Sequence, residues 1–121
     1  MNIPLHEFEL AAERLKPIVH HTALDPSTTF SRMTGGDIYL KCENRQKTGS
    51  FKIRGASNKI AAMIERGERC PVVASSAGNH AQGVAYAAKM FGIPATIVMP
   101  EAAPIAKVQA TEGYGARVVL A

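Results

Sequence analysis

One lysine has the surroundings of a reactive amine. Lys52 follows the aromatic Phe51 in the segment KTGSFKIRGA, at the expected start of a helix, and Arg54 comes two residues later. The positive end of a helix and neighbouring cations disfavour the ammonium form of a lysine. Because a neutral amine is the form that attacks a carbonyl, Lys52 is a candidate for Schiff-base chemistry. The alternative is a solvated surface lysine.

A second candidate segment is SSAGNH, residues 75–80, which connects an expected strand to an expected helix. Gly78 frees the turn, and the first backbone N–H groups of a helix have no partner within the helix. Such groups attract anions, so we expect a carboxylate or phosphate to bind near Asn79 and His80. The alternative is an ordinary turn in which the Ser76 hydroxyl caps the helix.

The elements around these segments alternate between strand and helix. Apolar spacing and Gly or Pro boundaries predict helices over 5–16, 51–67, 78–92 and 104–115, and strands over 37–42, 71–76, 94–100 and 116–121. Residues 22–36 are rich in Thr, Ser, Pro and Gly and are expected to form a connection with one helical turn.

This order predicts an α/β fold with an open, mainly parallel twisted sheet and helices on both faces, because the strands VVA and TIV are apolar throughout. The small side chains of Ala81, Ala85 and Ala88 should let their helix approach the sheet closely. Ligands of such sheets bind beyond the carboxyl ends of the strands. We therefore expect residues 43–52 and 75–80 to face one crevice.

Composition excludes several classes of protein. The 121 residues are 46% hydrophobic and 20% charged, which fits one globular domain rather than a fibrous or disordered chain. The sequence has no apolar run long enough for a membrane helix and no secretory pattern at its start, so a cytoplasmic protein without membrane contact is expected.

The basic residues gather between Lys41 and Lys59, where six of them face the single acid Glu43. No aromatic residues interleave with them as on a base-stacking surface, so a small anionic ligand is expected rather than a nucleic acid. Cys42 and Cys70 lack metal-binding spacing, so we expect two reduced core thiols and no metal site.

Three long segments carry a family resemblance. They are KCENRQKTGSFKIRGASNK (residues 41–59), SSAGNHAQGVAYAAKMFGIPATIVMP (75–100) and KVQATEGYGARVVL (107–120). From about His20 to the last residue, the chain resembles the threonine dehydratase and serine racemase group of fold type II pyridoxal-phosphate enzymes. The resemblance implies pyridoxal 5'-phosphate as cofactor and an amino acid as substrate. It implies the conversion of L-threonine, and of L-serine, to a 2-oxoacid and ammonia.

The resemblance also assigns roles to residues. Lys52 would bind the cofactor as a Schiff base and later take the α-proton of the substrate. Phe51 would pack beside the pyridine ring, and Asn79 would donate a hydrogen bond to the ring hydroxyl. The substrate carboxylate would bind to the loop formed by Ser76, Ala77, Gly78, Asn79 and His80.

The resemblance further implies two structural parts and a homo-oligomer. Residues 1–45 would pack on a separate large domain, and residues 46–121 would form part of a small α/β domain. Ala23 and Arg45 depart from the family pattern, and the family's glycine-rich phosphate cradle lies beyond Ala121. We therefore expect a partial form that has negligible activity when isolated.

Three alternatives remain at this stage. A serine racemase would need a second base on the opposite face of the cofactor, at the position held here by Ala77, so elimination is favoured. A binding module for pyridoxal phosphate or another small anion could keep the crevice without turnover. A structural subunit could complete its sheet with another chain through the strand ARVVLA.

Overall fold

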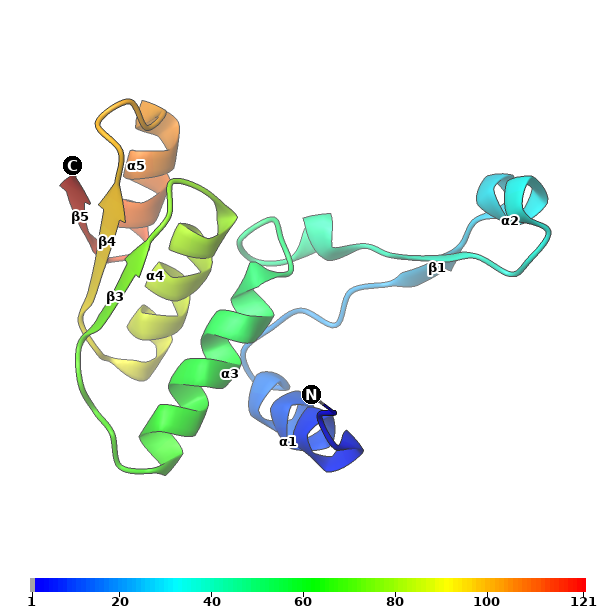
Figure 1. Cartoon of the computed structure of the whole chain (residues 1–121), viewed down its shortest axis with the longest axis horizontal. Coiled ribbons are helices and arrows are strands. Elements are labelled where there is room, and N and C mark those ends of the chain that lie inside the picture. Colours follow the sequence, from blue (N-terminus) through cyan, green and yellow to red (C-terminus); the bar gives the residue numbers. More distant parts are fainter. Residues whose placement is uncertain (1) are drawn as a thin grey trace.

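A three-stranded parallel sheet forms the centre of the computed structural model, which describes residues 2–121 (Figure 1). Its strands are β3 (Val72–Ser75), β4 (Ala95–Met99) and β5 (Arg117–Leu120), and they lie side by side in that order. Ala74 pairs with Ile97, and Ile97 pairs with Val118, in parallel register. The α/β fold with a parallel sheet is thus confirmed.

Two helices connect successive strands of the sheet. They are α4 (Asn79–Phe91) and α5 (Ile105–Gly113), and both lie on the same side of the strands (Figure 1). Strands that follow one another in chain order, with crossovers of one hand, place their helices on one face. Val73 on the other face is 72% exposed. Within residues 2–121, the packed helices therefore cover one face of the three-stranded sheet.

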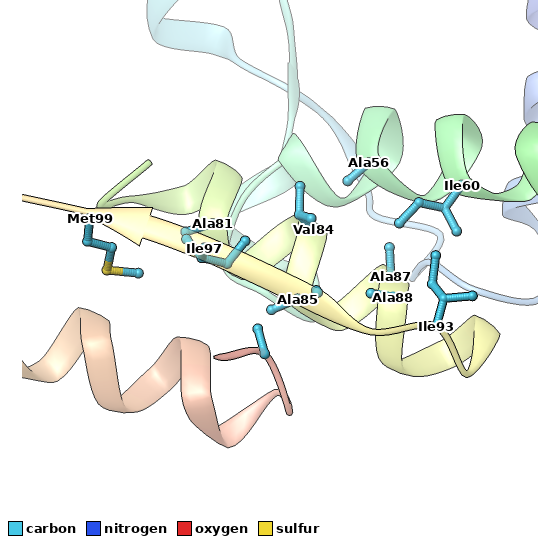
Figure 2. Close-up of a cluster of buried hydrophobic side chains, with 12 residues drawn as sticks. Ala56, Ile60, Ala81, Val84, Ala85, Ala87, Ala88, Ile93, Ile97 and Met99 are labelled. Atoms are coloured by element: carbon cyan, nitrogen blue, oxygen red, sulfur yellow. The ribbon is translucent and has the colours of Figure 1, made fainter. Parts of the chain in front are cut away.

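The core fills the space between this sheet and α4. Every second residue of β4, namely Ala95, Ile97 and Met99, is buried there, and Figure 2 shows Ile97 close to the alanines of α4. Ala81, Ala85 and Ala88 are at most 1% exposed, which agrees with the expectation from their small side chains. None of these three side chains is large enough to hold α4 away from the sheet.

The next layer is α3 (Lys52–Glu65), which packs along α4 through Ile53, Ala56 and Ile60. Its buried positions repeat every three or four residues, as the sequence predicts. On its other side, α3 contacts α1 (Leu5–Leu15), and Arg14 of α1 pairs with Glu65 of α3 at 2.7 Å. The expected helices therefore form, with bounds that differ by one or two residues.

The segment between α1 and α3 extends away from the body as an arm (Figure 1). Strand β1 (Leu24–Pro26) pairs antiparallel with β2 (Tyr39–Lys41), and α2 (Thr28–Thr34) lies between them. The Ser27 hydroxyl caps α2 by accepting from the Phe30 N–H, and Gly35 ends it with a φ of 73°. A short 3-10 helix, η1 (Glu43–Arg45), then leads back to the body.

Two expectations about this arm are wrong. Residues 37–42 do not belong to the parallel sheet, and residues 22–36 contain a strand as well as a helix. The Asp-Pro composition of β1 gives no strand signal, because Pro cannot donate to a ladder and is confined to positions such as this edge. Because the sequence gives no sign of β1, the apolar residues of β2 lead to the prediction that residues 37–42 belong to the main sheet.

The two cysteines also differ from expectation. Cys70 is exposed and Cys42 is half-buried, so neither is a core thiol, although both are free. Each lies outside the packed layers, Cys70 in the connection before β3 and Cys42 directly after β2. Hydrogen bonding to the Asp25 carboxylate, at 3.4 Å, raises the pKa of the Cys42 thiol.

None of the helices described here combines the length and hydrophobicity that a membrane crossing requires. Across residues 2–121, no three His, Cys, Asp or Glu side chains gather into a group that could hold a metal ion.

Candidate active site

Lys52 is the first residue of α3, and the burial of the next residue, Ile53, determines which way the Lys52 side chain points. The Ile53 side chain is fully buried, whereas Lys52 and Phe51 are exposed. Because successive residues of a helix point about 100° apart, burial of Ile53 turns Lys52 outward. The Lys52 Nζ lies 5.0 Å from the centre of the Phe51 ring. The amine and the aromatic ring thus share one surface at the start of α3.

A pocket of about 300 Å³ opens at this surface. It is lined by Phe51, Lys52, Arg54, Gly55, Ala56 and His80. The structure thus brings the lysine segment and the SSAGNH segment together, as expected, although for a different reason. The first turns of α3 and α4 meet here, and the expected strand 37–42 has no part in the sheet beneath them.

Gly83 allows this meeting of the two helices. A Cβ placed on Gly83 would lie 3.1 Å from the carbonyl carbon and oxygen of Lys52 and from the Ile53 nitrogen. The sequence reasoning above missed this residue. The available signal was a single glycine within an alanine-rich helix, where alanine is the better helix former.

The turn before α4 has no side-chain cap. The Ser76 hydroxyl accepts a hydrogen bond from the Gly78 N–H at 3.2 Å, and no side chain caps the helix itself. The alternative in which Ser76 caps α4 is therefore wrong. The first N–H groups of α4 stay available to an anion, as on other uncapped helices.

The other residues of this turn lie beside the pocket rather than in its lining. Ser76, Ala77 and Gly78 are half-buried, and Asn79 is exposed. Of the five residues assigned to substrate binding, His80 is the one that lines the pocket together with Lys52. The structure therefore gathers Phe51, Lys52 and His80, and it places Asn79 next to them at the start of α4.

Arg54 belongs to an ion pair that the sequence did not reveal. Its Nε and Nη2 donate to the two carboxylate oxygens of Glu43, each at 2.8 Å, and the Thr22 hydroxyl donates to the same carboxylate. The hydrogen bonds from Arg54 lower the pKa of Glu43 from 4.5 to about 2. The positive charge that the sequence places beside Lys52 is thus partly compensated.

Aromatic residues hold the loop that precedes Lys52. The Tyr114 hydroxyl donates to the Lys47 carbonyl at 3.4 Å, and the Lys47 Nζ lies 5.7 Å from the centre of the Tyr86 ring. The two tyrosine rings meet edge to face at 5.6 Å. These contacts tie the loop to α4 and to the end of α5.

The residues of this site fit part of pyridoxal phosphate. Lys52 offers an amine to the aldehyde, and Phe51 offers a flat apolar surface at the rim of a pocket of about 300 Å³. This volume falls in the range of small-molecule sites. The uncapped start of α4 suits a carboxylate or phosphate oxygen.

Comparisons with known proteins agree with this fit to pyridoxal phosphate. A family model described as "Pyridoxal-phosphate dependent enzyme" matches residues 15–121. The chain is 59% identical over 118 residues to the L-threonine ammonia-lyase of Thermotoga maritima, covering 98% of this chain and 29% of that protein. It is 53% identical over 119 residues to the catabolic L-threonine dehydratase TdcB of Staphylococcus aureus, covering 98% and 34%.

Among solved structures, maize serine racemase superposes with a TM-score of 0.88 and 42% sequence identity. The match covers 99% of this chain and 36% of the racemase chain. The chain thus spans about a third of the length of the curated relatives it matches.

Proposed function

The chain belongs to the family of pyridoxal-phosphate dependent enzymes, and we propose that it supplies the lysine-bearing part of a threonine ammonia-lyase. The observation that carries the choice of substrate is the 59% identity to L-threonine ammonia-lyase over nearly the whole chain. The pocket formed by Phe51, Lys52 and His80 supports the assignment, because it holds an amine where a cofactor can enter.

When bound, pyridoxal phosphate supplies an aldehyde for an amine and a ring that withdraws electrons from the α-carbon of an amino acid. Lys52 binds the cofactor covalently through Nζ, and Phe51 packs beside the ring. The Asn79 amide, at the start of α4, donates a hydrogen bond to the ring hydroxyl. An amide has no acid or base function near neutral pH, so Asn79 orients and does not transfer protons.

The substrate carboxylate binds at the uncapped N-terminus of α4. There the helix dipole and the free N–H groups stabilise a negative charge by about 0.3 to 2 kcal/mol. The residues that make this site are Ser76, Ala77, Gly78, Asn79 and His80. A carboxylate at this position brings the α-carbon of the amino acid toward the pocket that Lys52 lines.

Lys52 then acts as the base. Its Nζ would take the α-proton of the substrate and would then return a proton to the departing β-hydroxyl, so that this group leaves as water. Hydrolysis of the remaining enamine gives 2-oxobutanoate and ammonia from L-threonine, or pyruvate and ammonia from L-serine. A lysine serves both as attachment point and as base because its flexible stem can move Nζ between these positions.

Serine racemase is the second candidate, favoured by the superposition on the maize enzyme. Racemisation needs a proton donor on the face of the cofactor opposite Lys52. Ala77 holds the position expected for that donor, and its methyl group carries no proton that can be donated. Elimination is therefore the proposed main reaction.

The wider organisation is also part of the proposal. Residues 1–45 pack on a large domain, which is supported by the exposed apolar side chains of Leu5 and Phe8 on α1 and of Met33 on the arm. Residues 46–121 form part of the small domain around Lys52. The complete protein is a cytoplasmic homo-oligomer that serves threonine catabolism or isoleucine biosynthesis.

A chimera tests the proposed function. The chain replaces the matching 118 residues of the Thermotoga maritima enzyme, and 2-oxobutanoate formation from L-threonine is measured. We expect turnover of about 1 per second or more, its loss in Lys52→Ala, and its retention in the matched control Lys59→Ala on the same helix. A folded chimera that binds pyridoxal phosphate but leaves threonine unchanged would refute the proposal, and D-serine formed as fast as pyruvate would favour the racemase.

A further inference from the structure

We propose that Gly83 is a positioning residue for Lys52: its missing side chain lets the first turn of α3 rest against α4 and so directs the lysine into the pocket it shares with His80. The proposal rests on the proposed function, since it gives Lys52 a role that depends on orientation.

The contact at Gly83 is made with backbone atoms. A Cβ there would lie 3.1 Å from the Lys52 carbonyl carbon, the Lys52 oxygen and the Ile53 nitrogen. Backbone atoms inside a helix cannot rotate away as a side chain can, so any group larger than hydrogen must push the turn that carries Lys52. The other two glycines inside helices, Gly55 and Gly113, have nothing within 4 Å of the corresponding point.

Helix propensity does not explain a glycine at this position. Gly83 is buried in the middle of α4, a helix otherwise rich in alanine. Glycine there disfavours the helix by about 1 kcal/mol relative to alanine. A close approach to Lys52 explains why the smallest residue is present, because the space that alanine needs is already filled.

The same contact fixes the direction of the lysine. Ile53 is fully buried on the face of α3 that also carries the buried Ala56 and Ile60, and this resists rotation of the first turn of α3 about its own axis. With rotation blocked by Ile53 and separation set by Gly83, the Cα of Lys52 has one position relative to His80. A methyl group at residue 83 would move the turn by a few tenths of an ångström. A misplacement of about 1 Å can cost roughly a hundredfold in rate, so even this shift should be measurable.

The experiment compares Gly83→Ala with Gly113→Ala in the full chain. Both variants add a methyl group to a helix, but only the first adds it against Lys52. Two quantities are measured: the amide chemical shifts of Lys52 and Ile53 by NMR, and the ratio of pyridoxal phosphate fixed by borohydride on Lys52 to that on Lys59. The ratio separates positioning from general structure, because loss of fold changes both lysines.

We expect Gly83→Ala to shift the two amide signals and to lower the Lys52 to Lys59 ratio roughly fivefold, with Gly113→Ala matching the unmodified chain in both. Unchanged amide shifts, or an unchanged ratio despite shifted amides, would overturn the proposal. Unfolding of Gly83→Ala alone would assign Gly83 to the α3–α4 contact in general and would also overturn it. If the unmodified chain shows no preference for Lys52, the proposed function fails, while the amide shifts still decide whether Gly83 sets the position of Lys52.

Discussion

Arg54 binds the Glu43 carboxylate through two hydrogen bonds, donated by Nε and by Nη2, each 2.8 Å long. The pair spans the loop that leads from the arm into α3, and Arg54 stands two residues after Lys52. Their side chains are 32% and 16% exposed, so the pair is screened less than a surface ion pair. The contact joins the 3-10 helix η1 to the helical turn that carries Lys52.

This pair makes stability depend on pH. The pKa of Glu43 falls from 4.5 to about 2 in the folded chain because Arg54 donates to its carboxylate. A lowered pKa stabilises the fold above about pH 4.5, and that contribution is lost as the pH falls toward 2. We expect Glu43→Gln to lower the free energy of unfolding by about 1 to 2 kcal/mol at pH 7, after allowance for partial exposure.

Urea unfolding between pH 7 and pH 2 measures this effect. The difference between the original chain and Glu43→Gln should shrink as the pH falls below 4.5. Glu68→Gln is the matched control, since Glu68 forms an exposed pair with Arg66. A difference of equal size at pH 7 and pH 2 would mean that the ion pair does not stabilise the folded state.

The two cysteines should differ in reactivity. Cys70 is exposed, whereas Cys42 is half-buried and the hydrogen bond to Asp25 raises the pKa of its thiol. Since the thiolate is the reactive form, a thiol reagent at pH 7 should modify Cys70 first. Mass spectrometry of partly modified chain measures the order. Asp25→Asn should speed the modification of Cys42, and faster modification of Cys42 in the original chain would contradict this account.

Tyr114 should steady the loop before Lys52. Its hydroxyl donates to the Lys47 carbonyl, but at 3.4 Å the bond is long, so Tyr114→Phe should cost only about 0.5 kcal/mol of stability. Amide hydrogen exchange of residues 47–51 should nevertheless become faster. Tyr86→Phe is the control, because it keeps the ring beside Lys47. Equal exchange rates in the two variants would remove the Tyr114 hydroxyl from this role.

Ala77 should decide between elimination and racemisation. Under the proposed function, Ala77→Ser, made in the chimera with the Thermotoga maritima enzyme, would add a hydroxyl on the face of the cofactor opposite Lys52. We expect D-serine to appear while pyruvate formation continues, because the new hydroxyl can return a proton to the other face. Chiral chromatography of the reaction with L-serine measures both products. Racemisation already present with Ala77 would show that the donor lies elsewhere.

The sequence predicts the second half of the fold better than the first. From residue 71 onward, each strand and helix carries its own apolar pattern, and short crossovers leave one parallel arrangement. In the arm, β1 becomes a strand only because β2 pairs with it, and its residues Leu24–Pro26 have little strand preference of their own. Tertiary pairing decides the structure there.

The candidate site, like the fold, is only partly predictable from the sequence. Lys52 and His80 stand out because local features, a helix start and a glycine turn, predict their chemistry. The contacts of Gly83 with Lys52 and of Glu43 with Arg54 join segments 31 and 11 residues apart. A local sequence pattern does not show which distant residues come into contact. The roles of Gly83 and Glu43 therefore become apparent only from the packing in the structure.

The most direct test of the central claim is the place where pyridoxal phosphate attaches. The full chain is mixed with pyridoxal phosphate, reduced with borohydride and digested, and the modified peptides are mapped by mass spectrometry. Lys52→Arg serves as the control, since it keeps the charge but removes the amine that can react. We predict that Lys52 carries most of the label and that Lys52→Arg loses it. A label spread evenly over Lys41, Lys47 and Lys59 would mean that Lys52 is an ordinary surface lysine and would contradict the account.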